Sequence, residues 1–193
     1  MKHVKNFETA AEYKNGSGYV LPNVIYVEEI NGIMFNPIVP VSPNLVCVYN
    51  VTDTSRDTSL LYGYALKYIT RMIVDGVEMD VETYYQFDTE GVHTIEYILD
   101  DNTALPDMFF QNIEALISIK IPNTVSTIVG YFISYGLTNL QEIIFHSPIC
   151  PTITGSNHFG GNADKPIVIK YPNGADYSEL ITKLPEGWTT VEF

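Results

Sequence analysis

The stretch Leu116-Ile-Ser-Ile-Lys-Ile-Pro122 is echoed 24 residues later by Leu140-Gln-Glu-Ile-Ile-Phe-His146. Apolar residues occupy the first, fourth and sixth positions of both copies. A pattern that recurs at a fixed period of roughly 20 to 50 residues is typical of stacked repeats, because a short strand needs a neighbour on each side to bury its apolar residues. The pattern therefore predicts a stack of short strands in the C-terminal half of the chain.

The apolar residues of each copy are expected to point into this stack. A third copy of the pattern follows after a further 24 residues. Successive rungs should lie one strand spacing apart, about 4.8 Å. The residues predicted to face inward are Ile119, Ile121, Ile143, Phe145, Ile167 and Ile169.

A pair of residues that includes at least one aromatic side chain precedes each strand of the expected stack, and we call this pair an aromatic plug. The plugs are Phe109-Phe110, Phe132-Ile133 and His158-Phe159. The composite unit, apolar-x-x-Ile-x-Ile-Pro-Asn-x-Val-x-x-Ile followed by a plug and x-x-Leu, resembles the BspA-like leucine-rich repeats of surface proteins from gut and oral anaerobes. The resemblance covers roughly residues 95–171, and the plugs depart from the Ala-Phe and Cys usual in the family. It implies a protein that binds through a surface.

The end of the chain is expected to close the stack. Residues 176–184 carry apolar side chains at helical spacing, and Pro185 and Gly187 would end such a helix. Residues 188–193 are predicted to form a final strand, a termination that the family also shows. The apolar positions of the expected helix are Tyr177, Leu180, Ile181 and Leu184.

Residues 44–99 are predicted to form a small β-sandwich that covers the first repeat. Asp75-Gly76 lies between two strand-prone arms, which is a strong signal for a hairpin. Residues 84–97 alternate on both sides of a turn at 89–91, and the segment from Phe87 to Ile95 resembles the late hairpin of bacterial immunoglobulin-like modules. The predicted fold class is therefore mostly β, with a sandwich at 44–99 and a capped repeat stack at 100–193.

Residues 1–43 are predicted to be a separate piece. Residues 7–13 have the pattern of a short helix, and Asn31-Gly32 divides two apolar arms of a second hairpin at 24–35. Three prolines make the stretch that follows an extended linker, because proline fixes φ and removes a backbone donor. They are Pro37, Pro40 and Pro43.

Acidic residues dominate the chain, since 23 Asp and Glu against 10 Lys and Arg give a net charge of −13. This balance disfavours a nucleic acid partner, because binding to phosphates requires basic side chains. Ten of the carboxylates fall within residues 75–107, which contain no Lys or Arg. They indicate either a solvated strand surface or a Ca²⁺ site. Oxygen ligands for Ca²⁺ would come from Asp100, Asp101, Asn102 and Asp107.

No apolar run has the length of a membrane span, and the first residues lack the apolar stretch of a signal peptide. We expect the cell surface or a secreted state if a signal was removed, and otherwise a particle-associated or cytoplasmic protein.

Residue patterns for catalysis are weak. His146, Cys150 and His158 can be drawn as a zinc site, but a fourth ligand is not evident. The sequence has no nucleophile elbow, phosphate-binding glycine loop or His-Glu-x-x-His pair. We therefore expect no catalytic residues, no metal site and no cofactor.

Exposed aromatic rings and the outward positions of the repeats are the candidate binding residues. Tyrosines cluster in the predicted sandwich, and tyrosine serves both in strands and as an interface anchor. The candidates are Tyr62, Tyr64, Tyr68, Tyr84, Tyr85 and the expected exposed positions Ser118, Lys120 and Glu142. The function predicted from these features is non-enzymatic protein–protein interaction or adhesion. The alternatives are a carbohydrate-binding module that uses the tyrosines, and a component of a phage or other particle.

Overall fold

The computed structural model describes residues 44–193, apart from residues 108, 134, 156–158 and 160–164. The predicted helix at 7–13, hairpin at 24–35 and proline linker lie outside the described residues, as does His158.

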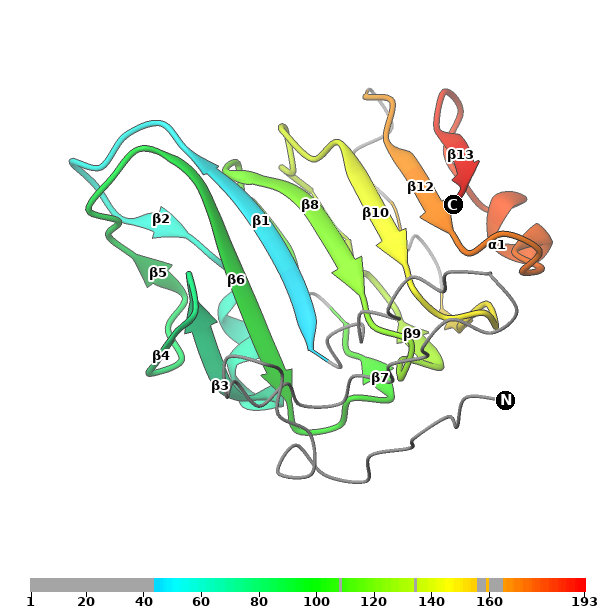
Figure 1. The fold of residues 1–193 in the computed structure, drawn as a ribbon, viewed down its shortest axis with the longest axis horizontal. Coiled ribbons are helices and arrows are strands. Elements are labelled where there is room, and N and C mark those ends of the chain that lie inside the picture. The colour runs from blue at the N-terminus through cyan, green and yellow to red at the C-terminus, as the bar shows by residue number, and fades with distance from the viewer. Residues whose placement is uncertain (1–43, 108, 134, 156–158, 160–164) are drawn as a thin grey trace, which may run out of the picture. The chain divides into compact units, whose positions relative to one another are not determined.

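One eight-stranded sheet runs through the described part of the chain (Figure 1). Its strand order is β13-β12-β10-β8-β1-β6-β3-β4. The first four strands of this order are parallel to one another, and the other pairs are antiparallel. The bounds are β1 (Leu45–Val51), β3 (Ile69–Val74), β4 (Val77–Met79), β6 (Gly91–Leu99), β8 (Leu116–Ile121), β10 (Glu142–Phe145), β12 (Val168–Tyr171) and β13 (Thr189–Glu192).

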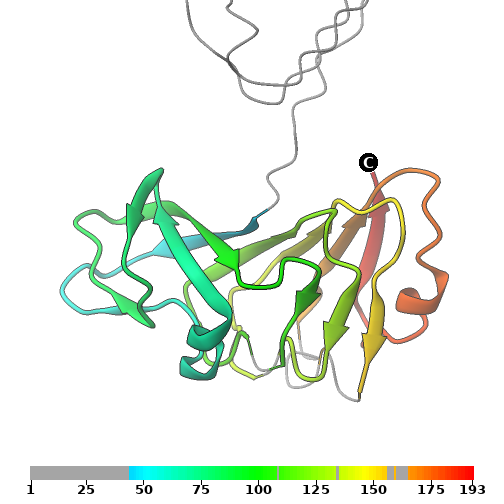
Figure 2. The ribbon, with the colours of Figure 1, turned by 90° about the horizontal axis from the view of Figure 1, so that it is seen from below.

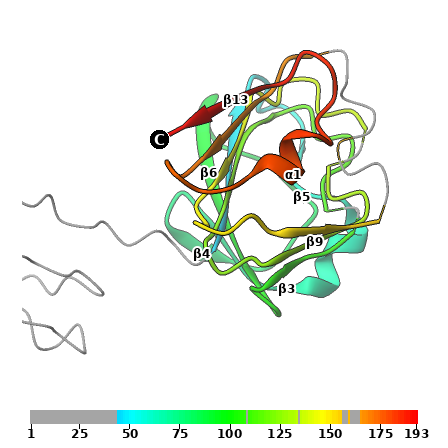
Figure 3. The same cartoon turned by 90° about the vertical axis from the view of Figure 1, so that its right-hand side faces the viewer.

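A second, three-stranded parallel sheet faces the strands of the repeats (Figures 2 and 3). It consists of β7 (Ala104–Leu105), β9 (Thr127–Val129) and β11 (Thr152–Thr154). Each turn of the chain contributes one strand to each sheet, which gives a solenoid-like stack of about three turns. The mostly β fold and the repeat stack are thus confirmed.

A separate β-sandwich at 44–99 is not confirmed, because those residues extend the sheet of the stack. β1 pairs with β6 on one edge and with β8 on the other. The pairing with β8 has a register shift between Val48 and Tyr49. The buried side chains of both regions form one continuous core. The antiparallel strands therefore serve as the lateral cover of the first repeat.

The register of the first two repeat strands is the one that the sequence predicts. Ile119 lies opposite Ile143, and Ile121 lies opposite Phe145. All six residues predicted to face inward are at most 1% exposed. The apolar positions of the pattern therefore form the inner wall of the stack.

The third rung is offset by 26 residues, so the predicted 24-residue offset is wrong at this point. Ile143 lies opposite Ile169 rather than Ile167. Ile167 precedes β12 and is still fully buried. The connection between β10 and β11 and the segment between β11 and β12 are each one residue longer than their counterparts in the preceding turn, and the two extra residues shift the register by one inward position.

The aromatic plugs fill the space between the two sheets. Phe110 and Ile133 form a parallel bridge, as successive turns of a stack require. Phe132 lies 5.6 Å from Phe110 and 6.2 Å from Phe109, measured between ring centroids. Offset and edge-on aromatic contacts of this kind add to the energy of area burial. The predicted plug positions at 109–110 and 132–133 are therefore confirmed as core.

A left-handed turn follows the plugs in equivalent places. Asn112 has φ +55° and Gly136, one repeat later, has φ +74°. Asparagine and glycine are the residues that tolerate this conformation best. The two residues are also in close contact, since a Cβ on Gly136 would lie 2.9 Å from Cα of Asn112. Glycine is therefore required here for backbone geometry and for space.

The Asp75-Gly76 hairpin is confirmed. Val74 lies opposite Val77, and the two turn residues have φ +48° and +83°, as a type I′ turn requires.

The hairpin predicted at 84–97 is wrong. β5 (Tyr84–Tyr85) pairs with β2 (Thr58–Ser59) in a small separate sheet, not with β6. β6 pairs instead with β1 on one edge and, from Ile95 to Leu99, with β3 on the other. A 3₁₀ helix, Gly63–Tyr68, lies between β2 and β3.

The C-terminal cap is confirmed in outline, with a shorter helix than expected. α1 (Ser178–Ile181) is a single turn, in which Leu180 is buried but Ile181 is 38% exposed. Tyr177 stacks on Tyr171 with ring centroids 4.8 Å apart and donates a hydrogen bond to the Ser147 carbonyl. The tyrosine ring, more than the helix, therefore covers the last turn.

Replacing Ile121 with Asp should lower the free energy of unfolding by several kcal/mol, because a charge would be buried without a partner. Thermal melting would show this as a fall in Tm of about 10 °C. Val191→Asp, at a position 46% exposed on β13, is the matched control and should change Tm little. Equal shifts for the two variants would contradict the inward orientation of Ile121.

Gly136→Ala should be more destabilising than Gly174→Ala. Both glycines have φ near +75°, but the added Cβ would meet Asn112 at Gly136 and nothing within 4 Å at Gly174. The control should therefore cost only the backbone strain, about 1 kcal/mol, and Gly136→Ala about 1 to 3 kcal/mol more. Urea denaturation of both variants measures the difference, and equal losses would argue against the contact between turns.

Candidate functional site

The tyrosines that the sequence groups together lie in separate places. Tyr64 and Tyr68 flank the ammonium group of Lys67, which lies 3.7 and 4.8 Å from their ring centroids. These rings already take part in an internal cation–π cluster. A hydrogen bond from Lys67 and a second one from Tyr68 lower the pKa of the Tyr64 phenol. Tyr62 is 40% exposed, and its backbone N–H donates to the Phe109 carbonyl.

Tyr84 and Tyr85 are adjacent on β5 and line two different pockets. Tyr85 is half-buried and packs edge-on against Phe87, with centroids 4.8 Å apart. Tyr84 is 58% exposed. The structure therefore does not gather the five tyrosines into one patch.

The three repeat positions form part of a ladder on the outer face of the sheet. Ser118 is only 5% exposed, so its expected exposure is wrong. Its hydroxyl donates to Glu142, whose other oxygen lies 2.6 Å from the Lys170 ammonium. Partial burial disfavours the charged carboxylate, but the hydrogen bonds from Lys170 and Ser118 and the nearby charge of Lys120 hold the pKa of Glu142 below its usual range. These residues stabilise neighbouring strands.

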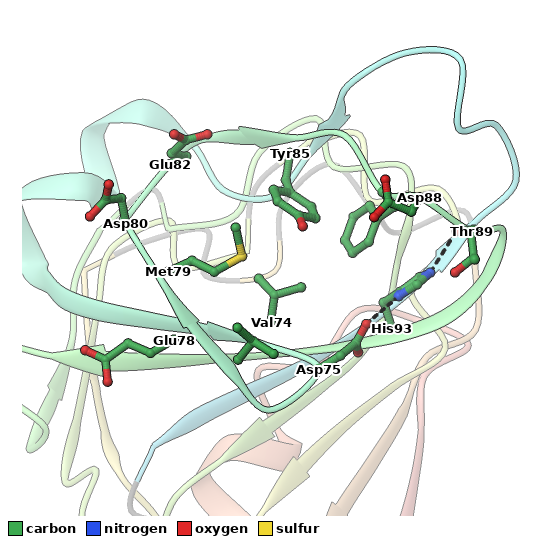
Figure 4. Close-up of a pocket in the computed structure, with 12 residues that line it drawn as sticks. Val74, Asp75, Glu78, Met79, Asp80, Glu82, Tyr85, Asp88, Thr89 and His93 are labelled. Carbon is green, nitrogen blue, oxygen red and sulfur yellow. Dashed lines mark hydrogen bonds and ion pairs between the residues drawn. The ribbon is translucent and has the colours of Figure 1, made fainter.

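A pocket of about 930 Å³ lies beside the Asp75-Gly76 hairpin (Figure 4). We call it the acidic pocket. Val74, Met79 and Tyr85 extend toward its middle, and Phe87 adds an aromatic wall. These side chains come from β3, β4, β5 and the segment that leads into β6. The pocket therefore has an apolar floor that no single stretch of sequence supplies.

Five carboxylates surround this floor, and no Lys or Arg is among the lining residues. They are Asp75, Glu78, Asp80, Glu82 and Asp88. Glu78 lies 3.3 Å from Arg71 outside the pocket, and both side chains are more than half exposed. An exposed pair of this kind is screened by water. The rim therefore carries an excess of acidic side chains.

His93 closes one end of the acidic pocket. Its Nδ1 lies 2.6 Å from a carboxylate oxygen of Asp75, and its Nε2 lies 2.9 Å from the Thr89 carbonyl. The ring packs on Phe87 and is 8% exposed. Burial of Asp75 disfavours its charged form, but hydrogen bonds from His93 and the Thr94 N–H lower the pKa of Asp75 below its usual range. Because both ring nitrogens are engaged, His93 braces the hairpin against the 89–91 turn.

A second pocket, of about 440 Å³, lies where the antiparallel strands meet the stack, and we call it the polar pocket. Tyr84 lines it from β5, and three asparagines line it from three other segments. No sequence pattern marks this site, because its residues are scattered between positions 50 and 139. The asparagines are Asn50, Asn112 and Asn139.

Two of the carboxylates predicted to bind Ca²⁺ instead accept hydrogen bonds from other residues of the chain. Asp101 accepts hydrogen bonds from the backbone and side chain of Thr103, and Asp107 accepts one from the Tyr131 N–H. In the described part of the chain, no group of three or more His, Cys, Asp or Glu residues is arranged to hold a metal ion. Burial raises the pKa of the Cys47 thiol well above its usual range.

Comparison of the chain with family models, curated proteins and solved structures gives no match. None of the helices among the described residues has the length and apolar character needed to cross a membrane.

The Asp75 carboxylate should make stability depend on pH at the acid end. Its pKa in the folded protein lies below the ordinary value of 3.8. The unfolded chain therefore takes up the proton first, so the contribution is full above that value and is lost as pH falls through the folded pKa. Urea denaturation from about pH 6 to pH 3 should show the difference in unfolding free energy between wild type and Asp75→Asn shrinking. A difference that stays constant over this range would contradict the assignment.

Proposed function

We propose that the protein is a non-enzymatic binding protein that captures a basic segment of a partner protein in the acidic pocket. The observation that carries the proposal is the combination of an apolar, aromatic floor with a rim of five carboxylates and no Lys or Arg. Lys and Arg side chains have the complementary form, because an aliphatic stem ends in a cationic head. The stem would lie on Val74 and Met79.

The aromatic wall supports the same ligand chemistry. A cation over the face of Tyr85, a ring that Phe87 packs against, is attracted by the ring quadrupole, and the attraction strengthens when the cation is removed from water. The same chain provides an internal example in Lys67, held between Tyr64 and Tyr68. The pocket volume is also within the range of small-ligand sites, roughly 300 to 1,000 Å³.

Protein binding is also what the resemblance to BspA-like repeats implies, and a stack of strands is a rigid support for such a site. His93 supports a binding role over catalysis, because both of its ring nitrogens face acceptors within the protein. An adhesive protein at a cell surface and a component of a particle would both use such a pocket.

The test uses a lysine-rich peptide and the same peptide with every Lys replaced by Gln. Biolayer interferometry should show saturable binding of the lysine peptide to the wild-type protein. Replacing Asp80, Glu82 and Asp88 by their amides should weaken that binding by about tenfold or more, since charge pairs in an apolar site contribute strongly.

The matched control neutralises three exposed carboxylates elsewhere, at Asp100, Glu186 and Glu192. It changes the net charge equally, so it measures long-range attraction alone. We expect affinity within about threefold of wild type for this control. The proposal is wrong if the lysine peptide does not bind, or if both triple variants lose affinity equally.

A further inference from the structure

The polar pocket differs in chemistry from the acidic pocket. Neutral amide and hydroxyl side chains make up much of its lining, including Asn50, Thr52 and Ser59. It contains a basic residue, Arg56, whose Nε lies 3.2 Å from Asp53. This pairing offsets part of the negative charge, so the pocket is suited to a neutral, hydrogen-bonding ligand.

Tyr84 supplies an aromatic platform at the edge of this pocket. Tyr84 is 58% exposed, which is the highest fraction among the five candidate tyrosines. A tyrosine ring has an apolar face and a polar tip, so one residue offers both a stacking surface and a hydroxyl. Tyr64, in contrast, already holds Lys67 against its ring.

The asparagines are held by the backbone of two successive turns. Asn139 Nδ2 donates to the Glu114 carbonyl at 2.9 Å, which leaves its Oδ1 as an acceptor toward a ligand. Asn112 sits at the left-handed turn position, and its side chain packs against Gly136. The Asn50 backbone N–H donates to the Ala115 carbonyl, which ties the end of β1 to the same turn. The amide groups are therefore attached to a backbone that does not need to rearrange.

From this arrangement we propose that the polar pocket is a glycan subsite, in which a neutral sugar ring stacks on Tyr84 and its hydroxyls bond to the asparagines. A sugar presents apolar C–H groups on one face and adjacent hydroxyls at its edge. The exposed ring matches the face, and a primary amide matches the hydroxyls because it carries donors and an acceptor in one plane. Glu114 and Asp57 add further acceptors at the pocket wall.

The test is affinity electrophoresis of the whole protein in gels containing a soluble β-glucan, xylan or galactomannan. We expect at least one polysaccharide to retard wild type, and Tyr84→Ala to abolish the retardation. Tyr84→Phe should keep most of it, because the stacking face remains. Tyr64→Ala removes an exposed tyrosine outside the pocket and should migrate as wild type does.

A second variant keeps the proposal testable if Tyr84→Ala does not fold, as judged by circular dichroism and Tm. Asn50→Ala removes an exposed amide from the pocket and should raise the Kd for the matching oligosaccharide by about tenfold, measured by calorimetry. The proposal is overturned if no polysaccharide retards wild type, or if Tyr64→Ala weakens binding as much as Tyr84→Ala does. Binding of the lysine peptide should be unchanged in Tyr84→Ala. Failure of the glycan proposal can therefore be distinguished from failure of the proposal for the acidic pocket.

Discussion

Strand β1 is hydrogen-bonded along both of its edges, and the rest of the described structure depends on this. The edge next to β8 closes the open side of the first repeat, and the edge next to β6 joins it to the antiparallel strands. A stack this short needs such a cover, because an exposed repeat strand would present unpaired backbone groups and apolar side chains. Leu45, Cys47 and Tyr49 are fully buried, so the inner wall continues without a break across the junction. A sandwich could not be distinguished from this arrangement by sequence, because strand pairing across distant segments leaves no local pattern.

The parts of the fold that the sequence predicted are those fixed by local chemistry. The alternation around Ile119 and Ile143 specifies one inward face, and a slip by a single residue would expose it. The Asp75-Gly76 turn is likewise set by two adjacent residues with positive φ. The 26-residue offset at Ile169 was beyond such reasoning, because an inward face repeats every two residues and the sequence fits either register.

The candidate sites show the same division. The run of carboxylates between 75 and 107 was visible in the sequence, but its interpretation as a surface or a Ca²⁺ site missed the apolar floor. Met79 and Phe87 belong to different strands or loops, and only tertiary packing brings them together. The tyrosine cluster was split for a comparable reason. Consecutive residues of a strand point to opposite sides, so Tyr84 and Tyr85 cannot line the same pocket.

Because Tyr84 and Tyr85 point to opposite sides of β5, this strand forms a wall shared by the two pockets. A strand of two residues has little stability of its own. A chain of hydrogen bonds, which begins at two buried tyrosine hydroxyl groups and passes through Leu60, holds β5 in position. The Tyr49 hydroxyl donates to the Leu60 carbonyl at 2.6 Å, and the Tyr97 hydroxyl donates to the Tyr49 hydroxyl oxygen at 2.8 Å. The Leu60 N–H in turn donates to the Thr83 carbonyl, one residue before β5. Burial raises the pKa of both phenols, so they remain neutral donors. Two tyrosines in the core of the main sheet thereby position the strand that separates an acidic pocket from a polar one.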